Sequence, residues 1–224
     1  MSIIYHVMSR GVDKRVIFQD DHDYLRFIHD LFEFNDTKPA DKFGLAKSDA
    51  TSDFASPNFH KPRELLVTLH AFCLMPNHYH LLISPIKEDG LLRFIRKLNI
   101  GYAKYFNQRY ERKGTLFESR YKSILVEREE HLLHLPYYIH CNPLDLTAPE
   151  WRERSLANPK QAWQFLEHYR WSSHPDYLGN KNFPSVTQRD FLLEFFGGTD
   201  GYRDALQKWL ENMDSTPPHE IILE

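Results

Sequence analysis

Two strand-like runs joined by a tight turn constrain the fold of this chain most. Apolar residues dominate positions 65 to 74, Pro76-Asn77 follows, and a second run continues from His78 to Ser84. Short β-forming runs separated by a two-residue turn are typical of a β-hairpin. The chain therefore has to build an antiparallel pair of strands here, and its other elements have to cover that pair.

The segments around the hairpin alternate between strand and helix patterns. Apolar residues recur at helical spacing from Tyr24 to Phe32, after the capping pair Asp20-Asp21, and again over a longer stretch that follows Gly90. Pro136 should kink or split a further helix, which is expected at 127–141. The expected elements are a strand at 3–9, a helix after 20–21, strands at 65–74 and 78–84, a helix at 91–110, a strand at 121–126 and a helix at 127–141.

This order predicts an α+β fold of the ferredoxin-like type, a split βαβ or RRM-like antiparallel sheet with helices. We expect a domain over residues 1–146, with a loop insertion at 35–62, and a mostly helical C-terminal extension over 147–224. The helices of the extension are expected near 160–169, 188–196 and 201–213. With the domain's helices on one face of the sheet, the opposite face should stay open for a substrate.

Composition excludes several classes of protein. The chain has 224 residues, of which 42% are hydrophobic, enough for a substantial core. It contains no apolar stretch of membrane-spanning length, and its first residues lack the pattern of a secretion signal, so we expect a cytoplasmic protein with no membrane partner. Cys73 and Cys141 lack CxxC spacing and are expected in the core.

Charge is distributed unevenly along the chain. The formal net charge is -3, yet residues 91 to 128 contain ten Lys or Arg against three Glu, a net of +7, so the remainder carries -10. A basic block of this kind fits a polyanionic partner, and a solvated helix face would look the same at this level.

His78 and His80 are the first candidates for chemistry. Alternate side chains of a strand share a face, so both imidazoles point one way while Tyr79 points the other. Two imidazoles can bind one metal ion, although a histidine in a half-buried sheet is also common for purely structural reasons. His6, His70 and His140 are interpreted as structural.

A third ligand and a nucleophile are available further along the chain. On a helix Tyr138 and Asn142, at i and i+4, share a face. Imidazole and amide oxygen suit an open site for Mg²⁺ or Mn²⁺, and a tyrosine beside a metal-bound phosphate can act as a nucleophile. The alternatives are a core aromatic at Tyr138 and a simple helix stop at Asn142-Pro143.

The chain resembles the single-tyrosine HUH transposases, in particular the branch of REP-associated tyrosine transposases. An ordered series of short motifs between residues 3 and about 178 carries the resemblance. The motifs are Tyr5-His6-Val7, Ser9-Arg10-Gly11, Met75 to Leu82 with its two histidines, Phe106 to Tyr110, Gly114 to Phe117, Arg120 to Ser123, Tyr138 to Pro143 and Tyr169 to His174.

The resemblance implies a ferredoxin-like nuclease that cuts single-stranded DNA beside a hairpin of a repetitive palindromic element. It implies Tyr138 as the nucleophile, His78, His80 and Asn142 as ligands of Mg²⁺ or Mn²⁺, and a covalent 5′-phosphotyrosine intermediate. Related transposases include dimers and monomers, so a homodimer remains open. The expected DNA-binding residues are Arg10, Arg93, Arg96, Lys97, Lys104, Arg109, Arg120 and Lys122.

Two departures and two rivals accompany this interpretation. Pro136 lies two residues before Tyr138 and makes Tyr137 a minor rival nucleophile, and the insertion at 35–62 is longer than the resemblance leads us to expect. One rival is a domesticated, catalytically silent protein that binds hairpin DNA or RNA. The other, a replication initiator or relaxase, usually brings larger domains than this chain has room for.

Overall fold

A four-stranded antiparallel sheet organises the molecule in a computed structural model that describes residues 3–39 and 63–213. The strands are β1 (Tyr5–Arg10), β2 (Val67–Met75), β3 (His78–Pro85) and β4 (Lys122–Leu125), in the order β2-β3-β1-β4. The turn at Pro76-Asn77 joins β2 to β3 as the sequence predicts. With its helices, this order confirms the expected ferredoxin-like α+β fold.

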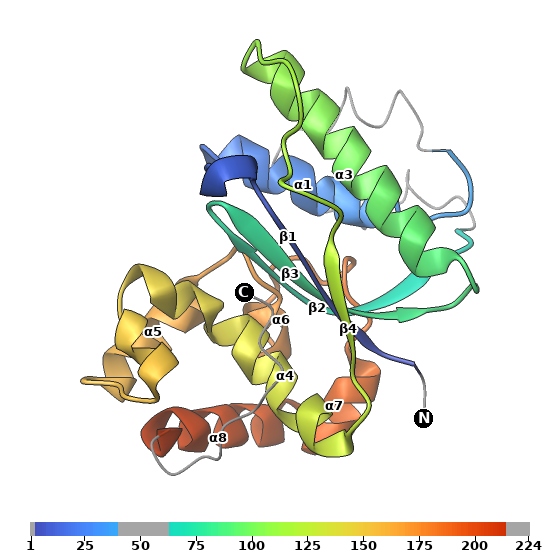
Figure 1. Cartoon of the computed structure of the whole chain (residues 1–224). Coiled ribbons are helices and arrows are strands. Elements are labelled where there is room, and N and C mark those ends of the chain that lie inside the picture. Colours follow the sequence, from blue (N-terminus) through green and yellow to red (C-terminus); the bar gives the residue numbers. More distant parts are fainter. Residues whose placement is uncertain (1–2, 40–62, 214–224) are drawn as a thin grey trace.

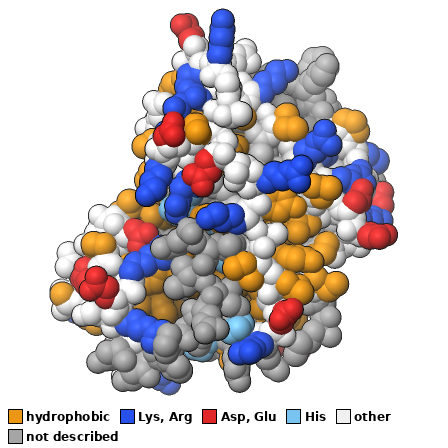
Figure 2. Space-filling view, viewed as in Figure 1, with side chains coloured by type: hydrophobic (Ala, Val, Ile, Leu, Met, Phe, Trp, Pro, Cys, Tyr) orange, Lys and Arg blue, Asp and Glu red, His pale blue; other side chains and the backbone are white. Residues whose placement is uncertain are grey.

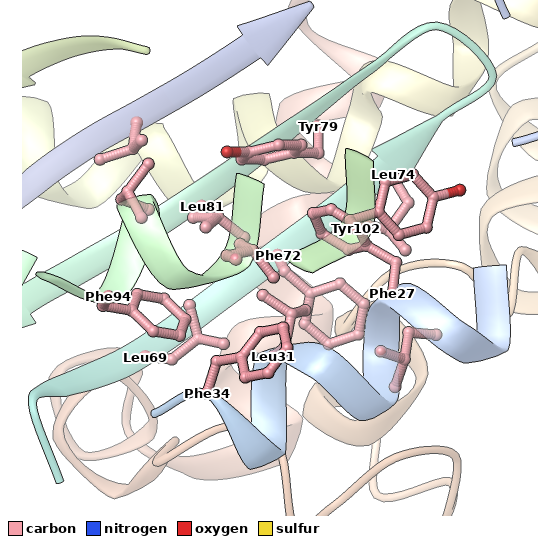
Figure 3. Close-up of a cluster of buried hydrophobic side chains, with 14 of the residues drawn as sticks. Phe27, Leu31, Phe34, Leu69, Phe72, Leu74, Tyr79, Leu81, Phe94 and Tyr102 are labelled. Atoms are coloured by element: carbon pink, nitrogen blue, oxygen red, sulfur yellow. The ribbon is translucent and has the colours of Figure 1, made fainter. Parts of the chain in front are cut away.

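Helices α1 (Asp21–Glu33) and α3 (Gly90–Arg109) pack on one face of the sheet (Figure 1). Asp20 caps α1, since its side chain accepts a hydrogen bond from the Asp23 backbone N–H. The core beneath these helices is aromatic and aliphatic, with Phe27 and Tyr102 packed against Tyr79 and Leu81 of β3 (Figure 3). We call this side of the sheet the α1/α3 face.

The opposite face of the sheet is covered, which corrects the expectation of an open surface. Helix α4 (Glu129–Cys141) and the helices that follow it lie on this side (Figure 1). Ala71, Cys73 and Leu82 of the sheet share a buried cluster with Ile139 of α4 and Leu206. The extension's amphipathic helices needed an apolar partner, and this side of the sheet supplies it. We call this side the α4 face.

Short helices build the covering layer. They are the 3₁₀ helices η3 (Asn142–Leu146) and η4 (Pro149–Glu153), then α5 (Pro159–His168), α6 (His174–Tyr177), α7 (Asp190–Phe196) and α8 (Gly198–Glu211). A further 3₁₀ helix, η1 (Val12–Lys14), follows β1. The three helices expected in the extension are thus present as α5, α7 and α8. Helix α4 is continuous through Pro136, so that proline does not split it.

The extension also closes the outer edge of β2. The Leu74 N–H donates to the Trp171 carbonyl, and the Ser173 N–H donates to the Phe72 carbonyl. Trp171 stacks on Tyr24 of α1, with ring centroids 4.5 Å apart. These bonds satisfy backbone groups that an edge strand would otherwise expose.

The predicted insertion lies mostly outside the described residues, which resume at Arg63. Asn35, at its start, is buried and ties the end of α1 to β2: its side chain accepts from the Leu66 and Val67 N–H groups and donates to the Val67 carbonyl. No helix in the described parts of the chain is long and apolar enough to cross a bilayer.

Candidate active site

Alternation along β3 places both predicted histidines on the α4 face. Tyr79 and Leu81 belong to the core under α1 and α3, so His78 and His80 point the other way. Their ring centroids are 4.9 Å apart. The antiparallel pairing with β1 sets Arg10 opposite His78. The two imidazoles and this guanidinium therefore meet at one end of the sheet.

Hydrogen bonds determine which nitrogens these rings leave available. His78 Nδ1 lies 2.6 Å from the Asn77 Oδ1, and because an amide oxygen only accepts, Nδ1 donates and Nε2 keeps its lone pair in the neutral ring. His80 Nδ1 lies 2.9 Å from His6 Nε2 on β1. His80 Nε2 is buried and has no hydrogen-bond partner in the described part of the chain. Each ring thus has a nitrogen that can bind a ligand.

Burial keeps these histidines neutral at pH 7. It lowers the pKa of His78 to about 4, with a smaller contribution from the positive charge of Arg10. It lowers the pKa of His6 to about 3, and the pKa of His80 falls well below its ordinary value for the same reason. Neutral imidazole is the form that binds a metal ion.

Helix α4 brings Tyr138 and Asn142 to the same place. The Tyr138 ring stands edge-on to the rings of His80 and His6, with both centroid distances 6.0 Å. Asn142 is buried at the end of α4, and its Nδ2 donates to the Tyr138 carbonyl over 2.8 Å. The four residues predicted from sequence, two from β3 and two from the end of α4, therefore converge on one site.

Arg152 of η4 completes the cluster, and no sequence pattern predicted it. Its guanidinium donates to the Tyr138 hydroxyl over 2.6 Å and to the Asn142 Oδ1 over 2.9 Å. It also forms a two-pronged ion pair with Asp145, at 2.8 Å for each prong. Burial lowers the pKa of Arg152, but the Asp145 carboxylate and the Tyr138 hydroxyl together outweigh burial, so the pKa rises above its ordinary value and the guanidinium stays charged.

His6 is the second residue that joins the site without having been predicted there. The sequence analysis assigned it a structural role only. The available signal was its place in a strand next to β3, where pairing with His80 depends on a register that only the folded sheet reveals. Arg152 offered no comparable signal, because its partners lie seven to fourteen residues away through two irregular 3₁₀ turns.

The donor set suits a hard divalent cation. Two neutral imidazole nitrogens and an amide oxygen are ligands that Mg²⁺ and Mn²⁺ accept with positions left over. Within residues 3–39 and 63–213, no group of three or more His, Cys, Asp or Glu side chains is placed to hold a metal ion. A site here thus depends on the amide of Asn142 as well as the histidines.

Comparison with known families bears directly on this cluster. Residues 60–142 match the family model described as "Transposase IS200 like". The expected family resemblance is confirmed over this segment. The matched residues include all four predicted site residues, His78, His80, Tyr138 and Asn142, whereas His6 and Arg152 lie outside them.

No curated protein matches the chain. A solved structure described as "Structure of the REP associates tyrosine transposase bound to a REP hairpin" is 12% identical, with a TM-score of 0.48 over 84% of this chain and 86% of that chain.

The basic residues predicted to bind DNA fall into two groups. Some are already engaged within the molecule: Arg109 pairs with Asp20 and Asp23, and Lys97 donates to the Asp36 and Lys38 carbonyls. Arg93 joins this group through Asp89 and the Thr37 carbonyl. The other group is defined by position: Arg10 at the end of β1 is half-buried, and Arg96, Lys104, Arg120 and Lys122 have exposed side chains.

A surface hollow lies between α3 and the chain entering β4. It has a volume of about 620 Å³, and Arg96, Arg120 and Tyr121 line it together with the apolar side chains Leu92 and Ile100. Figure 2 shows Lys and Arg side chains gathered over this half of the molecule beside exposed hydrophobic ones. Cationic and apolar groups side by side suit a chain of phosphates and bases.

Proposed function

We propose that this protein cuts and rejoins single-stranded DNA next to a hairpin, as a single-tyrosine transposase. One observation carries the proposal: Tyr138 and Asn142 at the end of α4 meet His78 and His80 of β3, with the Tyr138 and His80 rings in edge contact. The family match over residues 60–142 supports the same reaction class. The preference for a hairpin rests on the sequence resemblance to the REP-associated branch.

Tyr138 would act as the nucleophile. Its hydroxyl oxygen bonds to a backbone phosphorus while the bond from that phosphorus to the 3′-oxygen breaks. The phenol gives up its proton and the departing 3′-oxygen gains one, so a 5′-phosphotyrosine and a free 3′-hydroxyl result. Rejoining is the reverse exchange, with the tyrosine as leaving group, and the phosphodiester energy is conserved in the covalent link.

His78, His80 and Asn142 would hold the divalent cation. A bound Mg²⁺ or Mn²⁺ acts there as a Lewis acid that polarises the phosphate. The two histidines contribute by staying neutral through burial, and Asn77 and His6 orient their rings through the Nδ1 atoms. Asn142 contributes its amide oxygen from a buried position.

The DNA backbone would run over Arg10, which is half-buried, and over exposed basic residues on the same side and beside β4. Arg10 lies opposite His78, and Lys122 faces the same side of the sheet, because it pairs with Met8 one strand over. Arg96 and Arg120 line the hollow beside β4. We assign Arg109 to the fold instead, since its two carboxylate partners already neutralise it.

Covalent trapping tests the proposal. The probe is a single-stranded oligonucleotide carrying a palindromic hairpin from the DNA flanking the gene, incubated with the protein and Mn²⁺. We expect an adduct that survives denaturing electrophoresis and disappears in Tyr138→Phe, while DNA binding stays within about twofold of wild type, because only the attacking oxygen is lost.

Tyr137→Phe is the matched control. Tyr137 is adjacent in sequence but buried against Phe196 and Tyr202, so its variant should still form the adduct. An adduct that persists in Tyr138→Phe would disprove the nucleophile assignment. Tight binding with no adduct in wild type would instead support the catalytically silent binding protein.

A further inference from the structure

The C-terminal extension sends one side chain into the candidate site. Arg152 belongs to η4, beyond the end of the family match at residue 142, yet its guanidinium contacts both the Tyr138 hydroxyl and the Asn142 Oδ1. It is the donor in both bonds, because guanidinium has no acceptor. One side chain therefore links the candidate nucleophile to the candidate third ligand.

The surroundings of Arg152 hold it in one orientation. Asp145 receives two parallel hydrogen bonds from it and a third from the indole N–H of Trp151 at 2.6 Å. The guanidinium also lies 4.4 Å from the centroid of the Trp151 ring. Its side chain is only 21% exposed. A fork held on both sides in this way differs from a surface ion pair, whose geometry is loose.

We propose that Arg152 is a further catalytic residue, which fixes the Tyr138 hydroxyl and the Asn142 amide in the orientation that the reaction needs. This inference rests on the proposed function. Its charge also favours the tyrosine oxygen in its anionic form, both when that oxygen attacks and when it leaves on rejoining. The extension is thereby a part of the site as well as a cover for the sheet.

The orientation of Asn142 follows from the same contact. The Tyr138 carbonyl can only accept, so it faces the Asn142 Nδ2, and Arg152 can only donate, so it faces the Oδ1. The two bonds agree, and reversing the amide would break both.

Spectroscopy of the free protein tests the contact without DNA. The protein is labelled with [ζ-¹³C]tyrosine, and the Tyr138 signal is identified by its loss in Tyr138→Phe. We expect Arg152→Gln to move this signal at neutral pH and Arg203→Gln to leave it in place. Arg203 is a matched control, since it lies in the same extension but pairs with Asp200 and the Leu178 carbonyl. A Tyr138 signal unchanged in Arg152→Gln would overturn the inference.

Kinetics test the catalytic role. With saturating hairpin oligonucleotide and Mn²⁺, we expect the rate of adduct formation to fall about 100-fold in Arg152→Gln and about tenfold in Arg152→Lys, which keeps the charge but loses the fork. The dissociation constant for the oligonucleotide should stay within about twofold, which a general loss of structure would not allow. Arg203→Gln should react at the wild-type rate.

The outcomes separate this inference from the proposed function. If Arg152→Gln reacts like wild type while Tyr138→Phe does not react, only the role of Arg152 is wrong. If wild type forms no adduct, the proposed function fails and the catalytic role of Arg152 fails with it, whatever the spectrum shows about the contact. Partial rescue by lysine, together with a moved Tyr138 signal, supports the inference.

Discussion

The two faces of the central sheet differ in the kind of side chain they bury. Tyr79 and Leu81 of β3 enter the α1/α3 face, where the core is aliphatic and aromatic. On the α4 face the same strand presents His78 and His80 at one end and Leu82 at the other. One strand thus stabilises the fold with one set of alternate residues and forms the candidate site with the other.

The α4 face also contains most of the buried imidazole. His6 and His80 lie in the candidate site, and His140 and His174 lie in a second cluster where both Nδ1 atoms contact the Tyr202 hydroxyl, at 2.7 and 2.8 Å. His140 Nε2 also contacts the Ser173 hydroxyl. Besides its apolar cluster, the α4 face therefore contains buried polar contacts that depend on neutral imidazole rings.

Acidification should therefore destabilise the protein strongly. Burial lowers the pKa of His6 and His174 to about 3 and of His70 and His78 to about 4, and lowers those of His80 and His140 well below the ordinary value. The unfolded chain takes up protons below about pH 6.5 and the folded chain does not, so stability is complete above pH 6.5 and is lost as the pH falls.

The expected loss in the free energy of unfolding follows from the number of buried histidines. Each such histidine removes up to about 1.4 kcal/mol per pH unit from the free energy of unfolding, and small domains have about 5–15 kcal/mol in total, so we expect unfolding near pH 5. Urea titrations at pH 7.5, 6.5 and 5.5 measure it. A free energy of unfolding that is constant from pH 7.5 to 5.5 would contradict the contrast between the faces.

Tyr202→Phe should have the next largest effect. The substitution leaves the Nδ1 atoms of His140 and His174 buried without their shared partner, at a cost of about 2 kcal/mol in the free energy of unfolding. Tyr105→Phe is the control on the other side of the sheet. Tyr105 is only partly buried, so water can replace its hydroxyl, and we expect a smaller loss. Equal losses in urea titrations would remove the distinction.

Periodicity alone was sufficient for the framework of the fold. Apolar spacing, short β-forming runs and the turn at Pro76-Asn77 predicted the seven elements from β1 to α4, with ends that differ by a few residues. The covered α4 face was not predictable in this way. The apolar stripe of α8 shows that this helix packs against another apolar surface. Which surface it covers depends on contacts between residues far apart in the sequence, such as Leu206 with the cluster around Cys73.

The residues of the candidate site also fall into those that local spacing predicted and those that it did not. His78 and His80 were recognisable because two residues of spacing on a strand determine a shared face, and Tyr138 and Asn142 because four residues on a helix do. The contacts of His6 and Arg152 were not recognisable from the sequence. The His6 contact depends on strand register, and the Arg152 contact depends on how η4 folds back on α4. Local geometry can be read from spacing, while a partner brought in by tertiary packing cannot.

The hollow beside β4 should contribute the smallest of these effects. Arg96 and Arg120 lie on its rim, and Arg96 belongs to α3, on the face that lacks the histidines. If DNA passes over both, Arg96→Gln with Arg120→Gln should weaken binding of the hairpin oligonucleotide severalfold and reduce the slope of log K against log salt by about 1.4, two phosphate contacts at about 0.7 each. The adduct rate at saturating DNA should stay unchanged, because neither arginine contacts Tyr138.

Arg109→Gln is the control, since its loss should affect the ion pairs with Asp20 and Asp23 and leave the salt slope as it is. An unchanged slope in the double variant would place the DNA path entirely on the side of the histidines, with Arg10 and Lys122.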